Sequence, residues 1–281
     1  MRHLLAFVIV VVMFLLVGCA GFQVSQAELQ PVQKVTTATV RYPWLAVQPD
    51  AITHNINVIT PKAGYLRLTA NKGTFGEWVQ HLPLKAGNPT VRTYDGMEAP
   101  NQYKHAQVVD IDAGKDNLQQ SSNAILRLRA EYLFAKDRLG QINFPTKGGK
   151  RIDFRTWAKE KKLNTDHTAL IAYLNEVFAH ADAKTLAAML KPVADIHDME
   201  PGDVMVKQTE PSYAVLVMDV VEDPATKKRY FTLGTSHMPA QDFYVIINPS
   251  DSALSPWYPQ AFGKLIGLPE GVFQAEELMR F

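Results

Sequence analysis

The sequence predicts an α+β fold in which a helical first half packs on a C-terminal antiparallel sheet. Up to about residue 190, apolar residues recur at the spacing of amphipathic helices. After the turn signature at Pro201-Gly202 they form short β-branched and aromatic runs between turn residues, which is typical of antiparallel strands. Helices followed by strands is the order of an α+β domain. Because no repeat or long linker interrupts 46–281, we expect one domain there.

The helices are expected in the first half of the chain. The spacing of Thr74 and Glu77 is that of a capping box, and Pro83 ends the short helix that follows. Residues 117–139 form the longest predicted helix, with Gly140 at the C-cap position. Two further helices are predicted at 166–181 and 184–190.

The sheet is expected in the second half, with about four strands. Each predicted strand is a short apolar run bounded by turn residues, and the turn at 222–228 is charged. The four runs are 204–206, 213–221, 230–234 and 243–247.

Composition excludes several classes of function. In 281 residues, 29 Lys and Arg stand against 28 Asp and Glu, so no basic excess predicts a nucleic-acid partner. The chain has 1 Cys, which excludes disulfides, Cys-rich zinc sites and Cys-X-X-Cys redox chemistry. The common metalloprotease, phosphate-loop, dinucleotide and serine-hydrolase motifs are absent, so we expect no cofactor.

Two polar clusters were weighed as metal sites. Asp110, Asp112 and Asp116 surround Gly114, but the glycine is out of register for a calcium loop and no bidentate Glu follows. We therefore interpret them as a solvated turn. A second cluster lies around the Pro-Gly turn and is interpreted as a surface loop, since no second metal-spaced pair supports it: Asp195, His197, Asp198 and Asp203.

The N-terminus has the features of an export signal. A basic residue precedes the apolar run 4–17, whose length suits a signal peptide better than a spanning helix, although a short uncleaved anchor is the alternative. The run ends in Leu16-Val17-Gly18-Cys19, which resembles a bacterial lipobox. We expect a signal peptide over 1–18, acylation of Cys19, and a flexible tether over 19–45. The expected partner is a lipid bilayer and the location the cell envelope. In a Gram-negative host, Ala20 resembles the pattern for the outer membrane facing the periplasm.

From about Gly73 to Phe281 the chain resembles a bacterial envelope family called domain of unknown function 4846. The segments that carry the resemblance occur in matching order over roughly three quarters of the chain, which is more specific than any single motif. They are 78–84, 94–96, 126–133, 191–193, 202–204, 238–241 and 255–258.

The family's layout resembles papain-like cell-wall amidases and peptidases of the NlpC or CHAP kind. Such enzymes place a Cys at a helix start, a His on a following strand and a polar orienting residue on the next. Here the resemblance puts Ser121 at the Cys position, Tyr213 at the His position and Thr235 at the orienting position. A Ser without an adjacent base is a poor nucleophile, and Tyr, with an ordinary pKa of about 10, is no proton shuttle near pH 7.

Three functions follow from this reading. The first is a catalytically inactive papain-like lipoprotein that binds a peptide, a peptidoglycan stem or an envelope protein. Its cleft would include the three substituted positions, with Gln241, Trp257 and Tyr258 as further candidates, although core packing is the ordinary explanation for Trp257.

The second function is a rewired cell-wall hydrolase in which Ser121 or Ser122 pairs with His237. That histidine follows Thr235 by two residues, hence on the same strand face if the strand continues. The third is a structural or assembly lipoprotein whose cleft is filled and whose outer surface does the work. A cleft closed by Tyr213 would favour the third function over the first.

Overall fold

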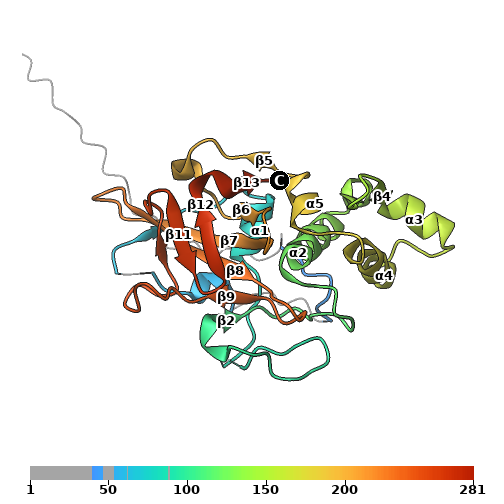
Figure 1. The fold of residues 1–281 in the computed structure, drawn as a ribbon, viewed down its shortest axis with the longest axis horizontal. Helices are drawn as coiled ribbons and strands as arrows, with labels where there is room; N and C mark the ends of the chain where they lie inside the picture. The colour runs from blue at the N-terminus through green and yellow to red at the C-terminus, as the bar shows by residue number, and fades with distance from the viewer. Residues whose placement is uncertain (1–39, 47–53, 62, 88) are drawn as a thin grey trace, which may run out of the picture. The chain divides into compact units, whose positions relative to one another are not determined.

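A large antiparallel sheet lies at the centre of the structure, with helices packed beside it (Figure 1). The computed structural model describes residues 40–46, 54–61, 63–87 and 89–281, which belong to the unit Thr36–Phe281. The mixed α+β class is thereby confirmed. The predicted signal peptide over 1–18 and the predicted lipidation site Cys19 lie outside the described residues.

The sheet is larger than the four strands predicted from the sequence. Within the described residues it has nine, and the four predicted runs are its adjacent strands β6 to β9. The other five strands come from distant parts of the chain. Each is only two to four residues long, which is too short to show the period of a strand in the sequence. In sheet order the main path is β2 (His105–Val108), β9 (Tyr244–Ile246), β8 (Arg229–Thr235), β7 (Tyr213–Glu222), β6 (Val204–Lys207), β13 (Leu278–Arg280) and β5 (Lys191–Pro192). Off this path, β1 (Leu66–Arg67) pairs with β7 and β10 (Tyr258–Pro259) pairs with β8.

Strand β7 is buried on both faces, which explains its nearly unbroken apolar sequence. Ala214, Leu216 and Met218 belong to the core cluster that contains the helices. Tyr213, Val215 and Val217 alternate with them and belong to a second cluster on the opposite face.

A β-hairpin covers that second face. Its strands are β11 (Leu265–Leu268) and β12 (Gly271–Gln274), which Figure 1 shows in dark red over the sheet. Ile266, Leu268 and Phe273 of the hairpin enter the second core cluster. This layer was not predicted from the sequence, because its two strands are only four residues long and each contains a glycine, Gly267 in β11 and Gly271 in β12.

Helix α1 (Phe75–Gln80) begins as predicted. The Thr74 side chain accepts a hydrogen bond from the Glu77 N–H and so caps the helix. The Glu77 carboxylate accepts from the N–H of Gly73, one residue before the cap, rather than from Thr74 itself.

Helix α2 (Ser121–Ala135) is shorter than the predicted 117–139. Its N-cap, Gln120, has extended backbone dihedrals, so the residues before it are outside the helix. At the other end Asp137 takes the left-handed conformation that the sequence assigned to Gly140, and Gly140 lies instead in the 3-10 turn Leu139–Gln141. The prediction of a Gly140 cap was therefore wrong.

The third and fourth helices lie on the side of α2 away from the sheet (Figure 1), whereas the fifth packs against both α2 and β6. Helix α4 (His167–Phe178) begins at Asp166 as predicted, and α5 (Ala183–Ala187) begins with a capping box at Asp182. Sequence analysis missed α3 (Phe154–Glu160) and the hairpin before it, formed by β3 (Asn143–Pro145) and β4 (Arg151–Asp153).

The folded unit includes the end of the segment expected to be a tether. Tyr42 is fully buried, and its hydroxyl donates to the Trp78 carbonyl at 3.1 Å. Trp44 donates through Nε1 to the Asp110 carbonyl at 2.6 Å. Residues 40–45 are thus tied to the domain by aromatic packing and hydrogen bonds.

Candidate functional site

Ser121, Tyr213 and Thr235, which the sequence resemblance equated with the positions of a papain-like triad, lie together at the start of α2; we call them the triad-equivalent residues. Ser121 is the first residue of α2, and its Oγ accepts a hydrogen bond from the Ala214 N–H of β7 at 2.9 Å. Thr235, on the neighbouring strand β8, donates to the carbonyl of the same Ala214 at 3.1 Å. The backbone of Ala214 therefore links the helix start to both strands.

Tyr213, which the resemblance put at the position of the catalytic His, has a buried side chain. Its ring lies 5.8 Å from the His237 ring and 5.9 Å from that of Phe273 in the covering hairpin. Burial raises the pKa of Tyr213 well above its usual range, and the charge of Glu270 raises it further, against the effect of the Thr235 hydroxyl. Tyr213 therefore stays neutral and cannot accept the Ser121 proton.

His237 is committed to other partners. The Met238 N–H donates to its Nδ1 at 2.7 Å, so the ring proton lies on Nε2, which is 3.0 Å from the Glu270 carboxylate. Both ring nitrogens of His237 are thus engaged in contacts within the fold. Within the described part of the chain, Ser121 and His237 share no hydrogen bond.

Glu270 anchors the hairpin beside this position. Its side chain is 1% exposed and accepts from Lys104 and Tyr244, each at 2.8 Å, as well as from His237. Burial opposes its ionisation, but these three donors outweigh it and lower the pKa of Glu270 to about 2.

The other candidate residues are buried. Gln241 is 4% exposed, and its carbonyl accepts from the Ser236 hydroxyl. Trp257 is 4% exposed within the helix-side core and donates to the Thr60 carbonyl, while Tyr258 stacks on Phe231. These side chains offer no open face to a ligand in this structure.

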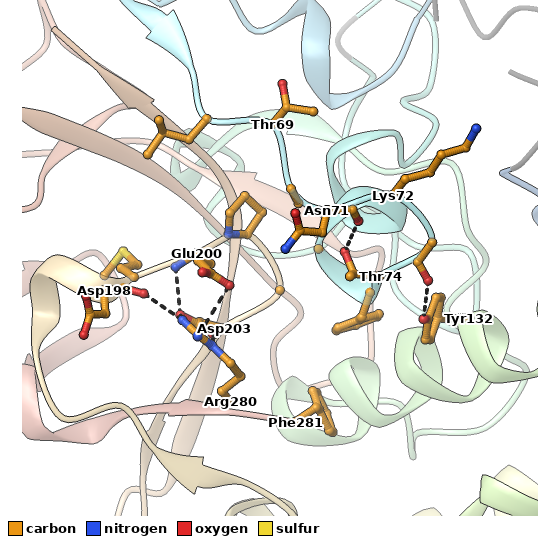
Figure 2. A pocket seen from close by; sticks show the side chains of 18 of the residues that line it. Thr69, Asn71, Lys72, Thr74, Tyr132, Asp198, Glu200, Asp203, Arg280 and Phe281 are labelled. Atoms are coloured by element: carbon orange, nitrogen blue, oxygen red, sulfur yellow. Dashed lines mark hydrogen bonds and ion pairs between the residues drawn. The ribbon is translucent and has the colours of Figure 1, made fainter. Parts of the chain in front are cut away.

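The main cleft lies elsewhere, beside α1 and the second half of α2. We call it the α1 cleft; it measures about 910 Å³ (Figure 2). None of the three triad-equivalent residues lines it. Its walls are the loop 68–74, the start of α1, residues 129, 132 and 138, the segment 198–203, and residues 229, 280 and 281.

Two glycines hold the walls of the α1 cleft together. A Cβ on Gly76 would lie 2.3 Å from the Pro201 carbonyl oxygen, so only glycine allows the segment 198–203 to approach α1 this closely. Gly202 has a φ of 93° and packs against the Gly76 backbone.

A buried ion pair fixes the far wall. Asp203 is 1% exposed and binds Arg280 at 2.6 Å, and Arg280 also donates to the Asp198 carbonyl (Figure 2). The sequence predicted a surface loop for all four residues of this polar cluster. That is correct for Asp195, His197 and Asp198 and wrong for Asp203, because its carboxylate is needed to pair Arg280 and to accept the Glu200 N–H.

The comparisons agree with the resemblance found in the sequence. A family model described as domain of unknown function 4846 matches residues 56–280. The chain belongs to this family. No match was found among curated proteins, nor among solved structures. The matched residues include the triad-equivalent residues and every residue that lines the α1 cleft except Phe281.

Sequence analysis missed the α1 cleft. The Gly202-Asp203 segment and the capping sequence at Thr74 were both noted, but nothing in the sequence indicated that they face each other. The order Gly73-Thr74-Phe75-Gly76 was the available signal, since a glycine inside a short helix often marks a close approach.

Two further findings concern metals and membranes. Across 40–46, 54–61, 63–87 and 89–281, no group of three His, Cys, Asp or Glu side chains is arranged to hold a metal ion. In the same part of the chain, no helix has the length and apolar character needed to cross a bilayer.

Proposed function

We propose that this protein is a lipid-anchored bacterial envelope protein whose papain-like domain is catalytically inactive and binds a peptide, a peptidoglycan stem or an envelope protein. The observation that carries the proposal is the state of the triad-equivalent position. Ser121 is bonded to the Ala214 backbone, and Tyr213 fills the space where a base would be required.

The backbone at this position supports a catalytic ancestry. Ser121 begins α2 with a φ of 30°, which side-chain-bearing residues rarely adopt. Such conformations cluster at active sites, where the surrounding structure enforces them. A helix N-terminus that holds a strained residue beside a strand is also where the papain-like layout puts its thiolate.

Because the triad-equivalent position is closed, we assign ligand binding to the α1 cleft. A cleft of about 910 Å³ is in the usual size range for small-ligand sites, about 300–1,000 Å³. Closure of the triad-equivalent position by Tyr213 would on its own favour the purely structural alternative. The α1 cleft is the reason why we propose ligand binding instead. In the structural alternative only the outer surface of the domain is used.

The test uses the full chain in detergent with purified peptidoglycan sacculi. We expect the protein to co-sediment with sacculi and to release no soluble muropeptides detectable by mass spectrometry. Ser121→Ala is the matched variant for the hydrolysis measurement. Release by the wild type that the variant loses would establish the rewired hydrolase, with His237 as its alternative base.

The binding arm of the experiment separates the other two functions. If sacculi and isolated stem peptides both fail to bind, the peptide-binding proposal is wrong and the structural or assembly function takes its place. A matched control is Lys159→Gln, which removes an exposed charge from α3. Lys159 is not among the residues that line the α1 cleft.

A further inference from the structure

The α1 cleft contains an arginine without a counter-ion. The Arg129 guanidinium lies over the rings of Phe75, Tyr132 and Phe281, with its Cζ 5.1, 5.2 and 4.7 Å from their centroids. Among the described residues it makes no hydrogen bond or ion pair, and the rings supply its contacts. Its donors are therefore unused by the fold.

Two arginines close to Arg129 are, by contrast, bound by groups of the protein. Arg127, two residues earlier on α2, binds Glu131, Gln119 and Asp112. Arg280, across the cleft, binds Asp203 through two nitrogens. Both arginines are satisfied by groups of the protein, whereas Arg129 has only aromatic faces.

The surroundings of Arg129 disfavour the charged form of its guanidinium. Burial lowers the pKa of Arg129 to about 10, Tyr132 opposes this shift, and the nearby charge of Arg138 lowers the pKa further. Cation–π contacts compensate part of the lost hydration but supply no negative charge. The guanidinium therefore favours a bound anion.

Basic side chains line one side of the α1 cleft, and the other side carries carboxylates beside Arg229 and Arg280. Lys72 and Arg138 are exposed, line the cleft together with Arg129, and form no ion pair among the described residues. On the other side Asp198 and Glu200 are exposed carboxylates, and Figure 2 shows them opposite Lys72 and Tyr132. Glu200 is 3.4 Å from Arg280 with its side chain 64% exposed, so it still faces solvent.

We propose that the α1 cleft is a binding site for a short zwitterionic peptide, with a free carboxylate of the peptide bound by Arg129 and an ammonium group facing Asp198 and Glu200. This deepens the proposed function and rests on it. A guanidinium matches a carboxylate with two parallel hydrogen bonds, and the aromatic rings below keep its plane fixed.

The exposed carboxylates of the cleft favour a ligand that also carries a positive charge. Lys72, Arg129 and Arg138 would attract a phosphate or a polyanion as well, but such a ligand offers no ammonium group to Asp198 and Glu200. A peptide that carries both charges meets a favourable partner at each side. Peptidoglycan stem peptides carry free carboxylates together with amines and are of this class.

The test measures binding of a synthetic stem pentapeptide by isothermal titration calorimetry, with the full chain in detergent. We expect binding to weaken roughly tenfold or more when the C-terminal carboxylate of the peptide is replaced by an amide, and likewise in the variant Arg129→Met. Methionine keeps the packing against the rings and removes the charge. Because the amidated peptide needs no change to the protein, a folding defect of the variant would not obscure the result.

Two matched variants and a second probe complete the experiment. Glu200→Gln should weaken the unmodified peptide and have no effect on an N-acetylated peptide without amines, whereas Lys159→Gln should leave both unchanged. Inorganic phosphate that binds as tightly as the peptide and displaces it would overturn the assignment to a peptide carboxylate.

The failures of the two proposals can be told apart. If the pentapeptide binds but neither amidation nor Arg129→Met weakens it, the assignment of the α1 cleft is wrong while peptide binding stands. If no stem peptide binds and sacculi do not either, the proposed function itself fails.

Discussion

Tyr213 determines what the triad-equivalent position can do. Its ring lies between His237 and Phe273, in a place closed by the hairpin β11–β12. Burial keeps its hydroxyl protonated far above neutral pH. In this arrangement Tyr213 supplies no base to Ser121, whose Oγ accepts a hydrogen bond from the Ala214 N–H, while Thr235 donates to the Ala214 carbonyl.

At the same scale, Glu270 makes the stability depend on pH. Its pKa falls from 4.5 in the unfolded chain to about 2 in the fold. A lowered pKa contributes stability that is fully present above pH 4.5 and is lost as pH falls towards 2. The shift corresponds to about 3 kcal/mol.

We therefore predict that Glu270→Gln lowers the free energy of unfolding at pH 7 by up to about 3 kcal/mol. The difference from the wild type should shrink between pH 4.5 and 2, as urea unfolding at several pH values would show. Glu160→Gln, at an exposed position of α3, should have little effect at any pH. An equal loss for Glu270→Gln at pH 7 and pH 2.5 would contradict the electrostatic explanation.

At the scale of elements, the contact between α1 and the segment 198–203 shapes the α1 cleft. Helix α1 is only one and a half turns long, and its capping by Thr74 was readable from the sequence. Its partner was not, because Pro201 and Gly202 are more than 120 residues away. The close backbone approach at Gly76 depends on both α1 and the segment 198–203, so neither sequence alone indicates it.

We predict that Gly76→Ala destabilises the protein although alanine is the better helix former. The new Cβ would lie 2.3 Å from the Pro201 carbonyl oxygen and force the two segments apart, at a cost of about 1–3 kcal/mol. Thermal unfolding would measure the loss. Gly267→Ala is the matched control, since no atom lies within 4 Å of its Cβ position. A Gly76→Ala variant as stable as the wild type would mean that the walls of the cleft move freely.

At the scale of the whole molecule, the expected anchor and the domain are separate parts of the chain. The expected lipobox ends at Cys19, and the described fold begins at residue 40 with Tyr42 already in the core. Lipidation by several acyl chains would hold the protein firmly at a bilayer, whereas one chain binds reversibly.

We predict that Cys19 carries the acyl chains. Expressed as the full chain in a bacterium supplied with labelled palmitate, the wild type should be labelled and found with membranes. Cys19→Ala should lose the label, and Ser25→Ala, in the same segment, should keep it. Label retained by Cys19→Ala would contradict acylation at Cys19, whereas an unlabelled wild type found with membranes would indicate the apolar run 4–17 as an uncleaved anchor.

Local features of this protein can be predicted from its residues alone. The class of the fold, the four central strands and the starts of α1 and α4 follow from periodicity and capping, which depend on residues within a few positions of one another. Membership of the family likewise followed from segments in order along the chain.

Only the tertiary structure decided the rest. The five short strands, the hairpin over Tyr213 and the α1 cleft each join segments that are far apart in the sequence. Arg129 shows the physical reason: beside Glu131 and Arg127 on one helix it looks like any helical cation. Its lack of a partner is set by which surfaces the fold brings to it, and those surfaces are the aromatic rings of Phe75 and Phe281.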